Sequence, residues 1–314
     1  MAKILVTGGL GFIGSNLVRE LRGRGHDVWF CDLTHSHDPK SIRCDVSKYR
    51  QVERLFEQQD FEYVYHLAAA YGRWNGEDYY ANLWLTNVVG TKNLIRMQEK
   101  KKFKMIFFSS AEIYGDYDGI MSEDVPEKIH IHLLNDYAMT KWVGEMMIKN
   151  SAMQYSTETV IVRPFNVYGP GEVPGKYRNV IPNFIWWAMH GQPLPITGTG
   201  EETRDFTFVE DIVDGTLRMG IAEEAVGEAI NLASETETRV IDLANWINEM
   251  TGNKAGIVFR QRRDWDKVIR RRASIEKARK ILGYEPKTDM KTGLRKVYEW
   301  MKENYENIKQ SVKF

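Results

Sequence analysis

Residues Val6 to Gly14 read VTGGLGFIG and place glycines at positions 8, 11 and 14. An apolar run over 3–7 precedes them and a helical pattern over 12–23 follows, so the glycines stand between a predicted strand and a predicted helix. In such a turn the first glycine permits a tight bend, the second lets the backbone approach a pyrophosphate, and the third allows close packing of helix on strand. Free N–H groups at the helix N-terminus then hold the anion. The stretch predicts a phosphate-binding strand–turn–helix.

An acidic residue ends the second predicted strand, VWFCD over 28–32. Asp32 follows Gly14 by 18 residues, where a carboxylate would bind the ribose hydroxyls of an adenosine. The same charge would repel a 2′-phosphate, which favours NAD over NADP. Basic side chains follow closely at His35, Lys40 and Arg43 and limit this preference.

The first half of the chain alternates apolar runs with helical patterns. Continuous β-rich runs are typical of strands that are buried on both faces of a parallel sheet. The alternation predicts an α/β fold with a Rossmann-type doubly wound parallel sheet. We expect strands over 3–7, 28–32, 63–68, 103–109 and 159–163, and helices over 12–23, 52–59, 79–98 and 137–150.

After about Pro164 the pattern changes, because Gly and Pro become frequent in RPFNVYGPGEVPGKYRNVIP and HGQPLPITGTGEETRDF. Such segments indicate loops over a smaller, less regular α/β domain that would bind the substrate. The expected division is 1–165, with 207–233 returning to it, against 166–206 and 234–314. Two amphipathic helices separated by GYEPKT are expected near the C-terminus.

The composition excludes several classes of function. Of 314 residues, 43 are Lys or Arg and 43 are Asp or Glu, so no net charge would attract nucleic acid or an anionic membrane. Cys31 and Cys44 are too few for a disulfide framework. The N-terminus lacks the pattern of a signal peptide, and no apolar run reaches the ~18 residues of a membrane span. We expect a cytoplasmic protein without a metal site.

The stretch NDYAMTKWVGE, Asn135 to Glu145, sets Tyr137 and Lys141 four positions apart. Both side chains would leave the same face of a helix, because four residues make just over one turn. Spacing alone leaves two interpretations open: a structural pair on a buried face, or a pair that transfers protons.

Five motifs in fixed order decide between these interpretations: TGGLGFIG, SSAEIYG, YAMTK, RPFNVYGPG and GTGEETRDFTFVEDI. Together they resemble the extended short-chain dehydrogenases/reductases that act as NAD-dependent nucleotide-sugar epimerases and dehydratases. The resemblance runs from Lys3 to about Pro286. It implies bound NAD, a nucleotide-diphosphate-sugar substrate and a homodimer.

The resemblance also assigns catalytic roles. Tyr137 would deprotonate a sugar hydroxyl while a hydride leaves the same carbon for NAD⁺. A free tyrosine titrates near ~10, so the Lys141 ammonium and the positive nicotinamide ring are expected to lower its pKa. Lys141 would also hold the nicotinamide ribose. Ser110 matches the residue that hydrogen-bonds the substrate hydroxyl and relays its proton to the tyrosine.

The binding residues implied by the resemblance form two sets. The expected cofactor contacts are Gly8, Gly11, Phe12, Ile13, Gly14, Asp32, Asp45, Val46, Leu67, Ala68, Ala69, Tyr137, Lys141 and Pro164. The expected substrate contacts are Ser110, Glu112, Asn166, Asn179, Arg204, and either Arg263 or Arg272 from the arginine-rich segment 260–272. Tyr71, Arg73 and Trp74 are expected to line the sugar site.

The step that follows oxidation at the sugar C4 depends on Glu112, two residues after Ser110. A carboxylate at this place removes the C5 proton in 4,6-dehydratases, which favours that reaction here. Dehydratases of the dTDP-glucose type also carry an acidic Asp at the position of Ala111, whereas other dehydratases manage without it. A C4 epimerase is the alternative, a decarboxylase of UDP-glucuronate is third, and a non-catalytic NAD-binding sensor is the reading from a different class.

Overall fold

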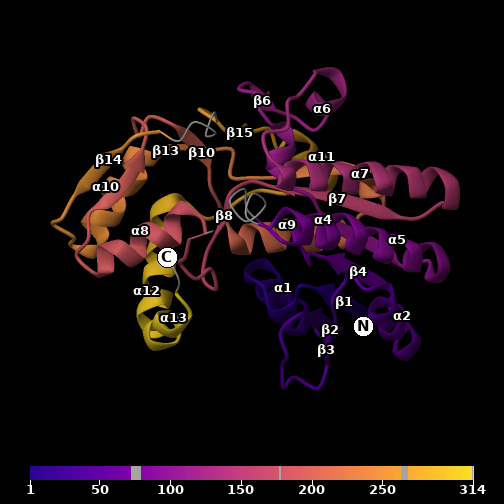
Figure 1. Cartoon of the computed structure of the whole chain (residues 1–314). Helices are drawn as coiled ribbons and strands as arrows, with labels where there is room; N and C mark the ends of the chain where they lie inside the picture. The colour runs from indigo at the N-terminus through magenta and orange to yellow at the C-terminus, as the bar shows by residue number, and fades with distance from the viewer. Residues whose placement is uncertain (72–78, 177, 263–267, 313) are drawn as a thin grey trace.

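The computed structural model describes residues 1–71, 79–176, 178–262, 268–312 and 314. Figure 1 shows two bodies: a sheet domain that begins with β1, and a smaller body that contains α8, α10, α12 and α13. Within the described residues, no helix combines the length and apolarity that would let it span a bilayer.

The sheet domain is built on a seven-stranded parallel sheet in the order β12-β7-β5-β4-β1-β2-β3. The chain builds outward from β1 to β2 and β3, and then crosses to β4 on the other side of β1. This reversal places the ligand crevice at the carboxyl ends of β1 and β4. The doubly wound α/β fold predicted from sequence is confirmed. Its strands are β1 (Lys3–Thr7), β2 (Asp27–Asp32), β3 (Ser41–Arg43), β4 (Tyr63–His66), β5 (Lys104–Phe108), β7 (Thr159–Pro164) and β12 (Ala229–Leu232).

Helices cover both faces of the sheet, and two hydrophobic cores lie between. One core joins the sheet to α1 (Phe12–Gly23), α9 (Val209–Ile221) and α11 (Glu276–Leu282). The other joins it to α2 (Tyr49–Gln58), α5 (Gly90–Lys101) and α7 (Asp136–Tyr155). The sheet is therefore buried on both sides, which explains the continuous apolar runs of its strands.

The helix expected over 79–98 differs from the prediction. It begins as α4 (Tyr80–Trp84), passes through a π-helical turn at Leu85–Val89 and continues as α5 to Lys101. Single π-helical turns inside longer helices are frequent at functional sites. Here the turn carries Asn87, whose side chain is buried.

The second body contains helices packed around two small sheets, with its own core. In it β9 pairs in parallel with β14, and β10 pairs antiparallel with β13. The two helices expected near the C-terminus are α11 and α12, and a third, α13, was not expected. The elements are α8 (Val180–Met189), β9 (Leu194–Thr197), β10 (Thr203–Asp205), β13 (Glu237–Arg239), α10 (Val240–Thr251), β14 (Ile257–Arg260), α12 (Met290–Glu303) and α13 (Tyr305–Ser311).

Short elements connect the two bodies. Between them the chain forms β8 (Val167–Tyr168), which pairs with β11 (Thr207–Phe208), and β15 (Arg272–Ala273), which pairs with β6 (Ile120–Met121). Short helical turns at Ala111–Tyr114, Val125–Lys128 (α6) and Glu223–Ala225 complete the sheet domain. Although α11 falls within the expected second domain, it packs on α9 and β12.

A buried chain of hydrogen bonds joins the end of β1 to α5. The Thr7 hydroxyl contacts His66 Nδ1 at 2.8 Å, and His66 Nε2 contacts the Thr91 hydroxyl at 3.1 Å. Thr91 donates its only proton to Asn87 O at 2.5 Å, so His66 Nε2 must be the donor to Thr91, and Nδ1 accepts from Thr7. Burial lowers the pKa of His66 to about 3, which keeps the ring neutral.

The Asn87 side chain extends this connection to α7. Its Oδ1 accepts from Ala70 N at 2.8 Å, and its Nδ2 donates to Ala70 O at 2.9 Å and to the Thr140 hydroxyl at 3.0 Å. Thr140 in turn donates to Tyr137 O at 2.8 Å. The loop after β4 and the first turn of α7 are therefore held in one arrangement.

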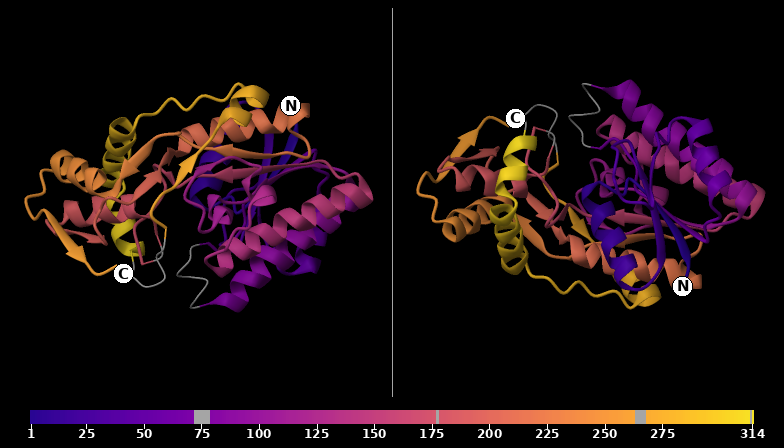
Figure 2. Two further views of the ribbon diagram at one scale, coloured as in Figure 1. Left: turned by 90° about the horizontal axis from the view of Figure 1, so that it is seen from above. Right: turned by 90° about the horizontal axis from the view of Figure 1, so that it is seen from below.

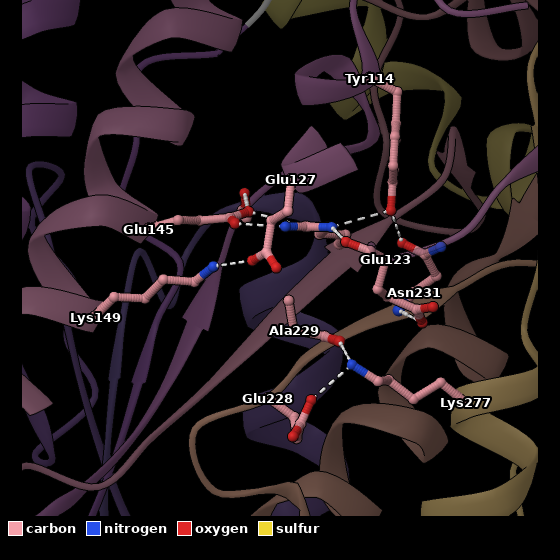
Figure 3. Close-up of polar contacts among 11 residues, drawn as sticks. Tyr114, Glu123, Glu127, Glu145, Lys149, Glu228, Ala229, Asn231 and Lys277 are labelled. Carbon is pink, nitrogen blue, oxygen red and sulfur yellow. Dashed lines mark hydrogen bonds and ion pairs between the residues drawn. The ribbon is translucent and has the colours of Figure 1, made fainter. Parts of the chain in front are cut away.

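A buried ion pair joins α7 to β7. Arg163 Nη2 lies 2.7 Å from Glu145 Oε2, its Nε donates to Glu145 Oε1 at 3.0 Å, and both side chains are at most 1% exposed. Arg163 Nη1 donates to the Tyr114 hydroxyl and to Glu123 O, and Figure 3 shows Tyr114 passing the network on to Asn231. Every donor of this network has a partner, which is the condition under which a buried charge is tolerated.

We predict that Arg163→Met destabilises the protein by about 3–5 kcal/mol, because it leaves Glu145 charged and buried without its partner. Denaturant unfolding measures the change. The double variant Arg163→Met/Glu145→Leu is the matched control and should recover most of the loss, because it removes both charges. Equal losses in the single and double variants would show that the ion pair is not the source of the effect.

Candidate active site

Two segments of the sheet domain meet at the predicted catalytic residues. The chain after β5 forms the turn Ala111–Tyr114, in which the Ser110 hydroxyl caps the backbone by accepting from Glu112 N at 3.2 Å. The helix α7 begins after Asn135, whose side-chain oxygen accepts from Ala138 N at 2.8 Å. Asn135 Nδ2 donates to Glu112 Oε2 at 3.2 Å and joins the two segments.

Tyr137 and Lys141 lie one turn apart on α7, as their spacing predicts. Lys141 Nζ donates to Phe108 O at 2.7 Å and lies 5.7 Å from the centroid of the Tyr137 ring. Tyr137 is hydrogen-bonded to Ser110 and lies within electrostatic range of Glu112. The structure thus brings Ser110, Glu112, Tyr137 and Lys141 into one cluster at the carboxyl end of β5.

Burial controls the protonation of this cluster. The pKa of Tyr137 is raised to about 12. Burial is the main cause and the Glu112 carboxylate adds to it, whereas the hydrogen bond with Ser110 lowers the pKa. Burial also lowers the pKa of Lys141 to about 7, against the opposing charge of Glu145. The protein's own groups therefore raise the pKa of Tyr137 instead of lowering it, and Lys141 is not among the groups that shift it. The lowering expected from the nicotinamide ring stays a prediction.

The glycine-rich turn has the close approaches that were predicted. Gly8 has a φ of +73°, a conformation that favours glycine. A Cβ on Gly14 would lie 2.1 Å from Gly8 O, so only glycine permits this approach of α1 to β1. Asp32 Oδ2 accepts from Leu10 N at 3.0 Å, which brings the carboxylate at the end of β2 against the same turn. This cradle and its acid fit the pyrophosphate and adenosine ribose of NAD.

The other expected cofactor residues surround this crevice. Phe12 and Ile13 form the first turn of α1. The buried Val46 follows β3, and its carbonyl accepts from Asn93 Nδ2 at 2.8 Å. Ala68 N donates to the Thr7 hydroxyl at 3.1 Å. The remaining positions also follow or end strands of the sheet: Asp45 after β3, Leu67 and Ala69 after β4, and Pro164 at the end of β7.

The expected substrate residues lie around β10 and its neighbours. Asn166, at the unusual φ of +26°, donates from Nδ2 to Asp205 O at 3.0 Å. Arg204 donates to Thr203 O at 2.9 Å and to Val268 O at 3.2 Å. These contacts hold both side chains against the backbone of β10 and its neighbours.

Two further residues expected to bind substrate have acidic partners. Arg272 Nε lies 3.9 Å from Glu237 Oε2, and β15, which carries Arg272, runs beside β10. Asn179, which precedes α8, donates to Glu172 Oε1 at 2.8 Å. Three expected positions, Arg73, Trp74 and Arg263, lie outside the described residues.

Sequence reasoning assigned no role to Asn135, Asn87 or Thr140. Asn135 is an Asn directly before a helical pattern, and this signal predicts an N-cap. Its second contact, to Glu112, joins segments 23 positions apart and has no sequence signal. Asn87 acts through the π-helical turn, which the helical pattern of its segment does not predict.

Comparisons with known proteins agree with this geometry. The family model described as "NAD dependent epimerase/dehydratase family" matches residues 4–233. A UDP-N-acetyl-alpha-D-glucosaminuronate decarboxylase of Bacillus cytotoxicus is 32% identical, over 96% of this chain and 98% of the relative.

Two solved structures extend the comparison. Epimerase Mth375 from Methanothermobacter thermautotrophicus has a TM-score of 0.94 and 42% identity, over 100% of this chain and 96% of that one. The Bordetella bronchiseptica enzyme WbmF in complex with NAD⁺ and UDP has a TM-score of 0.83 and 32% identity, over 98% and 95%. The family resemblance stated from sequence is thereby confirmed, and NAD is the cofactor. The chain belongs to the NAD-dependent epimerase/dehydratase family and is an enzyme of nucleotide-sugar chemistry.

Proposed function

We propose that this enzyme oxidises the C4 hydroxyl of a UDP-sugar to a ketone and then eliminates water across C5 and C6, which makes it a 4,6-dehydratase. The observation that carries the second step is the placement of Glu112. Its carboxylate is oriented by Asn135 and lies within electrostatic range of Tyr137. A simple C4 epimerase needs no acid or base beyond the tyrosine, so a carboxylate fixed at this point supports a further proton transfer.

Tyr137 is the base of the first step in this proposal. Ser110, which is hydrogen-bonded to the phenol, would receive the C4 hydroxyl and relay its proton. NAD supplies the acceptor for the hydride, and its positive ring opposes the rise in pKa that burial imposes on Tyr137. Lys141, fixed to Phe108 O, would hold the nicotinamide ribose and place a cation near the phenolate.

Glu112 removes the C5 proton in the second step. The C4 ketone acidifies this proton, and a carboxylate within reach can accept it. The C5 proton would pass to Glu112, and Glu112 would give a proton to the C6 hydroxyl so that it leaves as water. The 4-keto-5,6-alkene that results would take the hydride at C6 and a solvent-derived proton at C5. A C4 epimerase is the second candidate, because the solved structure at 42% identity is named an epimerase.

The UDP moiety would lie against the residues around β10. UDP is the nucleotide we propose, because the WbmF structure holds it and the curated relative carries it in its name. Arg204 and Arg272 supply guanidinium groups that suit a diphosphate, and Asn166 and Asn179 supply amides. Arg263 lies outside the described residues. That it also binds the diphosphate stays a prediction.

We also propose a homodimer. The helices α4, α5 and α7 lie side by side on one flank of the sheet domain, as Figure 2 shows. Apolar side chains along this flank are exposed, and exposed Met and Tyr are enriched at interfaces. They include Tyr80, Leu85, Val89, Met139, Met146 and Met153.

The central test is proton NMR of the reaction in D₂O with UDP-glucose and a panel of related UDP-sugars. The wild-type enzyme should produce a new methyl signal with solvent deuterium at C5. Glu112→Gln should slow this product by about 10²–10⁴-fold, while hydride transfer, read as reduced-nicotinamide absorbance, persists. Asp116→Asn, an exposed acid just after the same turn, is the control and should leave the rate unchanged.

Other products would contradict the dehydratase. An inverted C4 centre without deuterium uptake would establish the epimerase. Loss of the C6 carboxylate from a uronate would establish a decarboxylase. If wild type and Tyr137→Phe both bound NAD but turned over no sugar nucleotide, the proposal that this cluster is a catalytic site would be refuted.

Asp32→Ala should weaken NAD binding and reduce the preference for NAD over NADP by about tenfold or more, which is the scale of a hydrogen bond to a charged group. Calorimetric titration with both cofactors measures the ratio. Asp27→Ala, at the other end of β2, is the matched control. An unchanged ratio in Asp32→Ala would show that this acid does not bind the adenosine ribose.

Light scattering at micromolar concentration should give the mass of a dimer. Leu85→Glu/Met146→Glu should give a folded monomer, because it places two charges within the flank of α4 and α7. Ile221→Glu, at the exposed end of α9, is the control and should stay dimeric. A monomeric wild type would refute the homodimer.

A further inference from the structure

The carboxyl group of Glu172 has one oxygen without a partner. The side chain is 3% exposed. Its Oε1 accepts from Asn179 Nδ2 at 2.8 Å, whereas its Oε2 is buried and has no hydrogen-bond partner. No other carboxylate oxygen in the described ranges is both buried and unpaired in this way. Burial also raises the pKa of Glu172 to about 7. A buried polar atom without a partner calls for an explanation, and a ligand group that hydrogen-bonds to it is one.

The loop that carries Glu172 is fixed against the cofactor crevice. Gly169 and Gly171 have φ angles of +156° and +102°, and Glu172 N donates back to Gly169 O at 3.3 Å. A Cβ on Gly171 would meet Asn16 and Phe12 at 3.4 and 3.5 Å, at the start of α1. Asn16 Nδ2 also donates to the carbonyl of the intervening proline at 3.1 Å. The loop therefore holds its position beside the phosphate turn.

Arg178 and Tyr71 lie close to Glu172, and Tyr71 is one of the residues expected to line the sugar site. The Arg178 guanidinium lies 4.7 Å from the centroid of the Tyr71 ring. Arg178 lowers the pKa of Glu172, and the Glu172 carboxylate raises that of Tyr71, so the three groups lie within electrostatic range. Within the part of the chain that the structure describes, Arg178 is the one charged group that shifts the pKa of Glu172.

Tyr71 follows directly on the segment that is tied to α7. Asn87 holds both backbone groups of Ala70 and bonds Thr140, three residues beyond Tyr137. The segment that precedes Tyr71 is thus joined to the first turn of α7, which carries Tyr137. The loop of Glu172 thus contacts the start of α1, and its electrostatic neighbour Tyr71 lies next to the segment that is bonded to α7.

We propose that the Glu172 carboxyl group binds a hydroxyl of the sugar and makes the site select neutral sugars over uronic acids. The inference rests on the proposed nucleotide-sugar function. A sugar hydroxyl can donate to the unpaired oxygen or accept from its protonated form. A uronate would instead bring a second carboxylate beside Glu172 in a poorly solvated site. Two neighbouring carboxyl groups cannot both stay ionised there without a large cost, so a uronate would have to bind together with an extra proton, whereas a neutral sugar would not.

The test is calorimetric titration of the NAD-loaded enzyme with UDP-glucose and with UDP-glucuronate. Wild type should bind UDP-glucose more tightly. Glu172→Gln keeps the size of the side chain and an acceptor for Asn179 but removes the charge. It should shift the ratio of the two affinities toward UDP-glucuronate by at least about tenfold, the scale of a hydrogen bond to a charged group. Glu123→Gln, a buried acid that accepts from Asn231 N, is the matched control and should not shift the ratio.

The outcomes separate this inference from the function on which it rests. An unchanged ratio in Glu172→Gln would overturn the inference alone. A change in NAD affinity with an unchanged sugar ratio would also overturn it, because the carboxyl group would then face the cofactor ribose. If wild type bound neither UDP-sugar, the proposed function and the inference would fall together.

Discussion

The burial of the Lys141 ammonium is the constraint to which much of the sheet domain is adapted. An isolated ammonium in the interior would lose its proton, and the pKa of Lys141 is lowered in that direction. Phe108 O receives one of its protons, and Glu145, one turn further along α7, supplies the opposing charge. Glu145 is itself fully buried, and it is tolerated because Arg163 meets it from β7. The proton chemistry proposed for Tyr137 therefore depends on an ion pair that would contact neither substrate nor cofactor.

A second set of bonds fixes the geometry of the site. In the hydrogen-bonded chain from Thr7 through His66 and Thr91 to Asn87, each group donates to the next one. This order is fixed because each hydroxyl has a single proton to donate. A protonated His66 would break this order, and burial prevents protonation by lowering the pKa of the ring. The phosphate turn, the loop after β4 and the first turn of α7 are thus held by neutral hydrogen bonds, which salt screens little.

Much of this arrangement could be predicted from the sequence, and the reason lies in local patterns. The glycine spacing at 8, 11 and 14 predicts the turn, because a Cβ on Gly14 would strike Gly8 O. The apolar runs predict the parallel strands, since both faces of the sheet are covered. Contacts between distant segments, such as Asn135 with Glu112, leave no period or motif in the chain. The pKa of Tyr137 was expected to fall because of Lys141, but the extent of burial, which reverses the direction, is a property of the folded packing.

Which reaction the enzyme catalyses is harder to predict from the sequence than its fold or its cofactor, and the architecture explains why. In the proposed reaction Ser110, Tyr137 and Lys141 act with NAD in the oxidation at C4, and the buried ion pair and the hydrogen-bonded chain support that step. In the proposals above, the fate of the ketone depends on a few side chains near the sugar, of which Glu112 and Glu172 are two. Such groups can change without disturbing the sheet, because they lie on turns and loops after the strands. Decarboxylases and epimerases can therefore share this fold at similar identity, and the outcome of the reaction has to be argued from carboxyl groups near the sugar rather than from the fold.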